Sequence, residues 1–532
     1  GTPPRQAPSH FNTERLLTCP PRTGMAVLRS LAALWLGSGY ASALIHTSSV
    51  EERVRAEFET MKAAYDPPLP ELAGCKGFEC LERFVKTKDN FKWQGSPEAP
   101  AHGEKNGVKW TGYSLTFQSQ EWLQYWTGVH KWSHPMMVIV PENHVRNASN
   151  ADVGVLFLER SIDPTAAIEM ATRTGAVTLT VANMPFQPLT FHWMQKFSMD
   201  EDMARAWLWY MFSEQTEHPE WAIELPLAKA IVKAMDAATE YTANTEGLKR
   251  FIVTGHSQRA TGAYLAAALD PRVEAIIPLG MPLDVFQTLQ DSVQNLGGVT
   301  PKGLHFAEQE VMNFTDDQIK LVKSVVDPVS YMDRLKVPKL AMFSAGDDLL
   351  PPDCTRSWWG ELPGQKMLYI AGNAAHEGFE SNERTKYIEV ADSFISAFLS
   401  GKQMPEIKWK IDDQSGDILI KQITNHTRIS VSLVYTSSTM EGKRDFRSAE
   451  WYSSPLAPNG DGTWLAKAPE ETKWTAFFVS FEFDGPRSGG PPYRLTTEVS
   501  VTPNERPYPE AESVVPKWQR LIPPPNSPWW MR

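Results

Sequence analysis

The stretch from Phe251 to Leu269 constrains the fold more than any other part of the chain. Four residues of strand character, FIVT, lead into GHSQR (255–259), and an Ala- and Leu-rich segment with good helix propensity follows. A strand, an abrupt turn that carries a serine, and then a helix form the layout of a nucleophile elbow. The start of the helix directs N–H groups and the positive end of its dipole at any oxyanion that forms there. This stretch predicts an α/β fold with Ser257 as a nucleophile.

The residues around Ser257 in this turn have distinct expected roles. Gly255 is needed because a side chain at this position would collide with the turn, and Arg259 stands where the second glycine of G-x-S-x-G is expected. The N–H of Gln258, the residue after the nucleophile, is the first expected oxyanion donor, and His256 and Arg259 are candidate pocket residues. A buried strand-to-helix turn with an idle serine would give the same letters, so the rest of the chain has to decide.

Apolar strand candidates recur through the middle of the chain, and helical segments separate most of them. They lie at 136–140, 153–158, 176–181, 251–254, 274–279, 339–344 and 367–370. This alternation predicts a mostly parallel sheet covered on both faces, with its active residues at the carboxyl ends of the strands. We therefore expect an α/β domain over 136–402. Two segments, 190–247 and 283–327, interrupt the alternation and are expected to form a helical cap; the alternative is helical packing with no part in a pocket.

Two further strand ends offer partners for the serine. Asp347 lies in the turn after 339–344, and His376 lies in the loop after 367–370, which gives the order Ser…Asp…His. The chemistry needs a serine deprotonated by a neutral imidazole, whose other nitrogen is held by a buried carboxylate. Asp347 fits the turn better than Asp348, which remains a candidate pocket residue. The second oxyanion donor is expected after strand 153–158, near Arg160.

Composition limits the other possibilities. The chain has 532 residues, enough for two or three domains, and is 42% hydrophobic with 19 Trp. Its formal net charge of −11, with no basic run, argues against nucleic acid as a partner. Four cysteines without a His/Cys cluster suggest neither a metal site nor a cofactor, and the expected substrate is a small molecule or a peptide. Cys75 and Cys80 are close enough in sequence to form one small disulfide loop.

The N-terminal residues resemble targeting sequence. Residues 1–24 precede the first methionine, Met25, and are interpreted as a leader or as an artefact of cloning or transcription. Residues 25–43 combine a basic residue, a short apolar run and an A-x-A site, so we expect a secretory signal peptide cleaved after Ala43. The apolar run is too short to span a bilayer. Secretion is therefore expected, with an organelle or lysosome-like lumen as the alternative. N-glycosylation sequons at Asn147, Asn313 and Asn425 fit either route.

The remaining segments flank the α/β domain. Residues 44–135 are expected to form a helical and strand region that packs on the core. From about 405 to 505 the pattern changes to short alternating segments punctuated by Gly, Pro, Asn and Asp, which predicts an antiparallel β-sandwich. Residues 506–532 are a Pro-rich tail. The sandwich could bind a cell-surface or protein partner, or steady the α/β domain.

Several stretches resemble the PhoPQ-activated pathogenicity-related family, which also takes in the autocrine proliferation repressor proteins of amoebae. The resemblance covers roughly 110–505, and its longest stretches are FIVTGHSQRATGAYLAAALDPRVEAIIP (251–278), VDPVSYMDRLKVPKLAMFSAGDDLLPPD (326–353), LPGQKMLYIAGNAAH (362–376) and KRDFRSAEW (443–451). It implies an α/β-hydrolase fold and a Ser-Asp-His site. The family pattern at the elbow is G-x-S-K-R-G, so Arg259 is a family trait, whereas Gln258 and Ala260 are departures.

Two functions of different classes follow. The first is a secreted serine hydrolase, a peptidase or esterase that works through an acyl-enzyme. The second is a secreted signalling or binding protein that keeps the scaffold with little or no catalysis. A protein that has lost catalysis commonly lacks a triad member, and here all three candidates are present, which favours the enzyme.

Overall fold

The computed structural model describes residues 69–123, 131–144, 149–187, 189, 199–212, 218–308, 311, 314–378, 383–469 and 473–509. The chain divides into two compact units, Gly1–Glu57 and Phe58–Arg532, and all described residues belong to the second. The expected leader, the signal peptide, Asn147, Asn313 and most of the Pro-rich tail lie outside the described residues.

The centre of this unit is a ten-stranded mixed sheet with the order β1-β3-β4-β6-β5-β7-β8-β9-β10, in which β2 also pairs with β3. The pairs from β6 through β5, β7, β8 and β9 to β10 are parallel, and those from β1 to β4, with β4–β6, are antiparallel. The strands are β1 (Lys92–Gly95), β2 (Ala101–Lys105), β3 (Val108–Glu121), β4 (Lys131–Pro141), β5 (Val153–Leu158), β6 (Val177–Val181), β7 (Arg250–His256), β8 (Val273–Leu279), β9 (Lys339–Ser344) and β10 (Lys366–Ala371).

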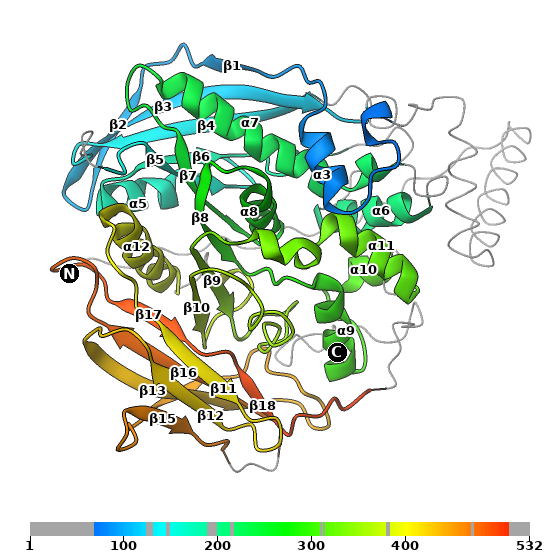
Figure 1. The fold of residues 1–532 in the computed structure, drawn as a ribbon, viewed down its shortest axis with the longest axis vertical. Helices are drawn as coiled ribbons and strands as arrows, with labels where there is room; N and C mark the ends of the chain where they lie inside the picture. Colours follow the sequence, from blue (N-terminus) through cyan, green and yellow to red (C-terminus); the bar gives the residue numbers. More distant parts are fainter. Residues whose placement is uncertain are drawn as a thin grey trace, which may run out of the picture. The chain divides into compact units, whose positions relative to one another are not determined.

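Helices cover both faces of the sheet. Helices α5 and α12 pack on one face, while α7 and α8 pack against each other on the opposite face (Figure 1). The helical elements are η2 (Pro70–Leu72), α3 (Phe78–Val85), α5 (Thr165–Thr174), α6 (Met199–Phe212), η4 (Pro219–Trp221), α7 (Glu224–Thr242), α8 (Gln258–Leu269), α9 (Val285–Leu296), α10 (Leu304–Glu308), α11 (Asp316–Val326), η6 (Pro328–Arg334) and α12 (Arg384–Ser400). This strand order, with a serine turn between the central strand β7 and α8, is the α/β-hydrolase fold.

Two expectations differ from the structure in their limits. The α/β sheet does not begin at 136, because β4 starts at Lys131 and β1 to β3 extend the same sheet by antiparallel pairing. The sequences of β1 to β3 alternate in polarity and lack the apolar run of a strand buried on both faces, so they do not indicate that these strands join the central sheet. Helix α7, inside the expected cap 190–247, instead covers the sheet, and its Ile231 packs against Gly262 of α8.

The helices of the second insert form a layer with α6. The ring of Trp207 on α6 stacks on Phe286 of α9 with centroids 4.9 Å apart, and it lies 5.6 Å from Phe306 of α10. Trp207, Phe286 and Phe306 are all buried. Aromatic contacts of this kind bury large apolar areas, and the Trp207 indole N–H also donates to Glu224 of α7 at 2.9 Å.

The C-terminal domain consists of two antiparallel sheets. One has the order β11-β12-β15, and the other has the order β14-β13-β16-β17, with β18 also paired to β16. The inner faces meet through rings such as Trp464 and Phe481, whose centroids are 5.2 Å apart. The strands are β11 (Ile407–Ile411), β12 (Ile418–Gln422), β13 (Arg428–Ser437), β14 (Tyr452–Pro455), β15 (Thr463–Ala466), β16 (Thr475–Phe483), β17 (Tyr493–Thr496) and β18 (Ser500–Thr502).

The sandwich and the α/β domain share one continuous apolar core. Buried residues of β9, β10 and α12 belong to the same cluster as those of β12, β16 and β17. Strand β17 lies against β10, where the Thr496 hydroxyl donates to the Leu368 carbonyl at 3.5 Å. The two domains therefore pack as one body within the described chain.

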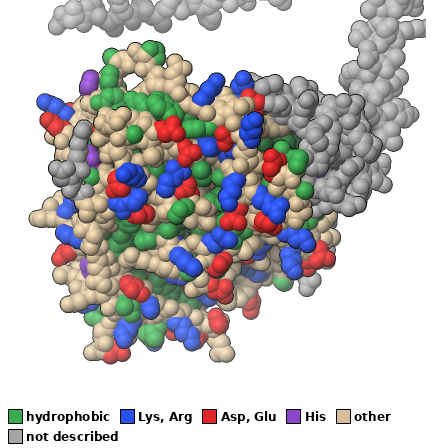
Figure 2. Space-filling view, turned by 45° about the horizontal axis from the view of Figure 1, so that its top comes forward, with side chains coloured by type: hydrophobic (Ala, Val, Ile, Leu, Met, Phe, Trp, Pro, Cys, Tyr) green, Lys and Arg blue, Asp and Glu red, His purple; other side chains and the backbone are tan. Residues whose placement is uncertain are grey.

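The surface is mixed in charge. Figure 2 shows acidic and basic side chains interspersed over the face that it presents. None of the helices in the described ranges combines the length and the apolar character that a membrane crossing requires. Asn425, the one sequon asparagine among the described residues, is exposed between β12 and β13.

Candidate active site

The elbow at the end of β7 holds Ser257 in an unusual backbone conformation. Its φ of 57° and ψ of −128° lie in a region that non-glycine residues seldom occupy, and such strain persists only where the surroundings impose it. The Ser257 N–H donates to the Leu279 carbonyl at 2.8 Å, which fixes the turn to β8. A Cβ on Gly255 would lie 2.7 Å from the Arg259 Cβ, so the expected need for glycine is confirmed.

The structure brings Ser257, His376 and Asp347 together in one chain of hydrogen bonds. The Ser257 Oγ lies 3.1 Å from the His376 Nε2, and the His376 Nδ1 lies 2.6 Å from the Asp347 Oδ2. The three side chains follow β7, β10 and β9, whose carboxyl ends meet at one edge of the parallel sheet. The bond to a carboxylate assigns the proton to Nδ1 and leaves Nε2 as an acceptor for the serine hydroxyl.

Asp347 is the carboxylate that contacts His376, and its other oxygen accepts hydrogen bonds from the backbone. The N–H groups of Leu349 and Leu350 donate to its Oδ1 at 2.7 and 3.0 Å. Burial raises the pKa of Asp347, but the charge and hydrogen bond of His376 and the two backbone donors together lower it below its ordinary value. The carboxylate therefore stays ionised although only 3% of the residue is exposed.

The two imidazoles at this site differ in their electrostatics. Burial lowers the pKa of His376, and the adjoining Asp347 carboxylate raises it by more, so that its pKa lies above the ordinary value. Burial, with the positive charges of His376 and Arg259, lowers the pKa of His256 to about 3. The rings of the two histidines are 4.8 Å apart between centroids. His256 is therefore neutral, and no second positive charge on it opposes the protonation of His376.

Lys302, which the sequence did not single out, connects the loops that carry the acid and the histidine. Its Nζ lies 2.8 Å from Glu377 Oε1 and 3.4 Å from Asp348 Oδ1. It belongs to the segment between α9 and α10, so this part of the insert 283–327 contacts the loops that follow β9 and β10. Asp348 is thereby tied to a lysine and not to the histidine, which distinguishes it from Asp347.

The expected oxyanion donors lie on the two sides of the elbow. Gln258 starts α8, where helix geometry leaves the first N–H groups without carbonyl partners in the helix. Its buried side-chain amide has no hydrogen-bond partner among the described residues. Beyond β5, the Glu159 N–H donates to the Val181 carbonyl at 2.8 Å and is therefore not available, whereas Arg160 is exposed and its carbonyl accepts from Asn183.

A cavity of about 140 Å³ adjoins the elbow. It lies between the sheet, α5 and α12, and it includes His256 and Arg259, the two expected pocket residues on the elbow. Its walls are largely apolar, while Glu159, Asp163 and Arg384 add charge. A second cavity, of about 20 Å³, has Asp347, Asp348 and the sandwich residue Arg444 in its walls.

The described part of the chain also contains three cysteines and possible metal-binding side chains. Cys75 and Cys80 form a disulfide beside α3, and Cys354 is a buried free thiol. Within the described ranges, no three His, Cys, Asp or Glu side chains gather in a way that could hold a metal ion.

The described site can be set beside known proteins. The family model for the PhoPQ-activated pathogenicity-related protein matches residues 81–447. The chain belongs to this family. It is 28% identical over 468 residues to autocrine proliferation repressor protein A of Dictyostelium discoideum, a match that covers 80% of this chain and 91% of that protein.

Solved structures of low sequence identity resemble parts of this family member. An acetyl xylan esterase from Paenibacillus sp. R4 matches with a TM-score of 0.40 and 16% identity over 58% of this chain and 91% of that one. Acetyl xylan esterase 1 from Thermoanaerobacterium sp. JW/SL YS485 matches with a TM-score of 0.38 and 13% identity over 61% of this chain and 98% of that one.

Proposed function

We propose that this protein is a serine hydrolase that cleaves an ester or amide of a small molecule or peptide through an acyl-enzyme. The observation that carries the proposal is the unbroken hydrogen-bonded series from Ser257 through His376 to Asp347. A serine within reach of a neutral imidazole that a carboxylate orients is the arrangement that nucleophilic catalysis needs.

In the proposed reaction, the Ser257 oxygen attacks the substrate carbonyl while His376 Nε2 takes its proton. His376 then gives that proton to the leaving group, and a water molecule hydrolyses the acyl-enzyme by the same steps in reverse roles. Asp347 holds the imidazole in the correct tautomer and stabilises the imidazolium. The N–H of Gln258 is the first proposed oxyanion donor, and that of Arg160 is the second.

We further propose that the protein works in an oxidising compartment, either outside the cell or in a lumen. The Cys75–Cys80 disulfide supports such a compartment, because disulfides persist where thiols are not kept reduced. The signal-like segment 25–43 supports the same proposal.

Labelling by a fluorophosphonate probe tests the proposal, because the probe reacts with an activated serine. The wild-type protein should be labelled, and Ser257→Ala should abolish labelling. His376→Ala should slow it by about 10⁴-fold or more, because the triad acts as a unit. Ser453→Ala, which removes an exposed serine of β14, is the matched control and should be labelled like the wild type. Labelling that survives Ser257→Ala would contradict the proposal.

A binding protein on the same scaffold is the second candidate. Four of the five exposed large hydrophobic residues among the described ones, Leu419, Ile423, Ile429 and Tyr452, lie in the sandwich. This candidate requires that these side chains form one contiguous apolar patch where another molecule binds. A folded wild-type protein that the probe does not label would favour this candidate.

A further inference from the structure

The loop between β13 and β14, residues 438–451, contacts both of the loops that carry the proposed acid and base. We infer that this bridging loop positions the triad, so that the sandwich domain forms part of the hydrolase site. The inference rests on the proposed function. Its positioning residues are Arg444, which acts on the acid turn, and Asn373, which joins the histidine loop to the bridging loop.

On the acid side, Arg444 holds the turn that follows β9. Its Nη1 and Nη2 donate to the two carboxylate oxygens of Asp353 at 3.1 and 2.8 Å. Asp353 lies at the far end of the turn that begins with Asp347, and only 1% of the Arg444 side chain is exposed. A buried bidentate pair of this type fixes both distance and orientation. The bridging loop thereby restrains the turn that carries the proposed acid.

On the base side, the bridging loop holds the start of the histidine loop. The Asn373 Nδ2 donates to the Trp451 carbonyl at 3.0 Å, and the Trp451 N–H donates back to the Asn373 Oδ1 at 2.8 Å. The neighbouring Gly372 lies so close that an added Cβ would be 3.0 Å from the Trp451 Cβ. Asn373 is three residues before His376, so this reciprocal pair sets where the imidazole loop leaves the sheet.

The bridging loop is itself restrained, so it can transmit position. The Ser438 hydroxyl donates to the carbonyls of Lys443 and Met440 at 2.5 and 3.0 Å, which closes the loop on itself. The Arg447 guanidinium donates twice to the Asp445 carboxylate, at 2.9 and 2.6 Å. The Arg444 N–H also donates to the Asn295 carbonyl at 3.1 Å, which adds a contact with α9.

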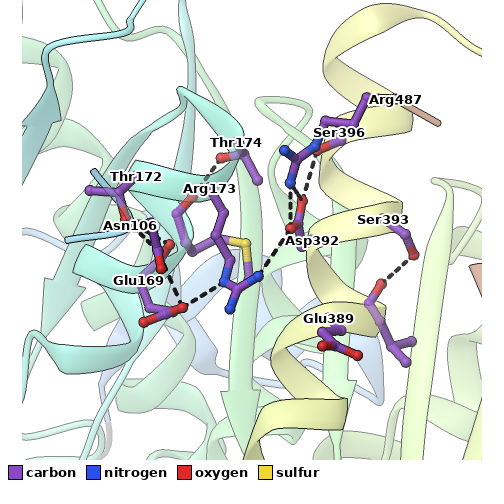
Figure 3. Close-up of polar contacts among 12 residues, drawn as sticks. Asn106, Glu169, Thr172, Arg173, Thr174, Glu389, Asp392, Ser393, Ser396 and Arg487 are labelled. Carbon is purple, nitrogen blue, oxygen red and sulfur yellow. Dashed lines mark hydrogen bonds and ion pairs between the residues drawn. The ribbon is translucent and has the colours of Figure 1, made fainter. Parts of the chain in front are cut away.

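A second arginine of the sandwich provides a matched control. Arg487 donates to both oxygens of Asp392 on α12, at 2.7 and 2.5 Å, and Figure 3 shows this pair beside Arg173 of α5. The pair also joins an arginine of the sandwich to an aspartate of the α/β domain, but it uses one guanidinium nitrogen of a side chain that is 40% exposed, and it ends on a helix and not on a loop of the triad. Removal of Arg487 therefore tests what is lost when an interdomain ion pair of this kind is removed in general.

The experiment compares full-length wild type, Arg444→Gln, Asn373→Ala and Arg487→Gln. We expect fluorophosphonate labelling to slow by about 10- to 100-fold in Arg444→Gln, because a small misplacement of a catalytic group has effects of this size. Asn373→Ala should slow it by about tenfold, and Arg487→Gln should stay within about twofold of wild type. Arg444→Lys, which keeps the charge without the bidentate geometry, should recover part of the rate.

Two further measurements separate positioning from loss of structure. The acid limb of the pH–rate profile should move to lower pH in Arg444→Gln, because an imidazole held less closely by Asp347 loses its proton more readily. Hydrogen–deuterium exchange in 345–353 and 372–378 should accelerate in Arg444→Gln and Asn373→Ala but not in Arg487→Gln. Asn373→Ala keeps the test available if Arg444→Gln does not fold.

Three outcomes would overturn the inference. Labelling and loop exchange in Arg444→Gln and Asn373→Ala could equal those of the wild type, or Arg487→Gln could slow labelling as much as Arg444→Gln. In either case the bridging loop does not act on the triad in particular. A wild-type protein that the probe does not label would overturn the proposed function and, with it, the role of the bridging loop in catalysis. Unchanged hydrogen–deuterium exchange in the variants would then also show that the bridging loop does not restrain residues 345–353 and 372–378.

Discussion

The interface between the two domains has two ends, and at each an arginine of the sandwich pairs with an aspartate of the α/β domain. At one end Arg444 meets Asp353 in the turn after β9, and at the other Arg487 meets Asp392 on α12. Helix α12 is held by continuous helical backbone bonds and by a buried apolar face, whereas the turn after β9 is irregular and has only scattered backbone bonds, such as that from the Gly346 N–H to the Ala374 carbonyl. The Arg487–Asp392 pair should therefore stabilise the fold, whereas the Arg444–Asp353 pair should set the position of the turn that carries Asp347.

The largest effect is expected from substitution of Asp347, the proposed acid near the Arg444 end of the interface. Asp347→Asn should slow fluorophosphonate labelling by about 10⁴-fold, because an amide favours the wrong tautomer of His376. Asp348→Asn, the neighbouring control, should change the rate by about threefold or less, because its ion pair with Lys302, in which 28% of the Asp348 side chain is exposed, is partly screened by solvent. Rates for both variants, measured with the wild type, check this. Equal effects at 347 and 348 would mean that the acid is assigned to the wrong residue.

The pH dependence of labelling gives the next effect. His376 must be neutral to accept the serine proton, and its pKa lies above the ordinary value of 6.5. The rate should therefore fall by about tenfold for each pH unit below that raised pKa. In Asp347→Asn the carboxylate that raises the pKa is gone while burial still lowers it, so the acid limb should move to lower pH. A limb that does not move in Asp347→Asn would argue against coupling between these two groups.

At the α12 end, stability should change without activity. Asp392 is fully buried, and its carboxylate accepts from Arg487 and from the Ser396 hydroxyl. Asp392→Asn should lower the free energy of unfolding by about 2–3 kcal/mol, since the buried pair is broken while Arg487 can still reach solvent. Urea titration measures this loss, and the labelling rate of the folded protein should stay at the wild-type value. A parallel fall in labelling would remove the distinction between the two ends.

The smallest effect is expected from one methyl group at the triad end. A Cβ at 372 would lie 3.0 Å from the Trp451 Cβ, so Gly372→Ala should displace the histidine loop by a few tenths of an ångström and slow labelling by about threefold. Gly360→Ala is the control, because a Cβ there has no atom within 4 Å. The labelling rates of Gly372→Ala and Gly360→Ala, each compared with the wild type, measure this effect. Identical rates would show that the contact with Trp451 tolerates displacement.

The parts that the sequence predicted are those set by local rules. The elbow follows from a glycine, a serine and a helix-forming run that are adjacent in the chain, and the acid and histidine follow from their places after successive parallel strands. The fold class was correct for the same reason, since buried parallel strands have a recognisable apolar run. The catalytic roles of Ser257, Asp347 and His376 remain predictions that labelling has to test.

The parts that the sequence missed depend on contacts between distant segments. Arg444 lies 91 residues from Asp353, and Lys302 lies 75 from Glu377, so no spacing in the chain indicates either pair. An arginine or lysine in a polar stretch is ordinarily solvated, which gives such residues no signal of their own. Helix α7 falls within the expected cap 190–247 because it lies in a helical segment between a strand and the elbow strand, whereas its packing against β3, β1 and α8 shows that it covers the sheet.

The place of β17 against β10 has a consequence for how the protein can be divided. β10 is the outermost strand of the large sheet, and an outermost strand that is left bare offers its unpaired backbone groups to other chains. Because β17 shields that side and the apolar core continues beneath it, a chain cut after residue 402 should self-associate and precipitate. The sandwich thus protects this edge of the sheet from aggregation. Its removal should lower the solubility of the protein before it lowers the activity.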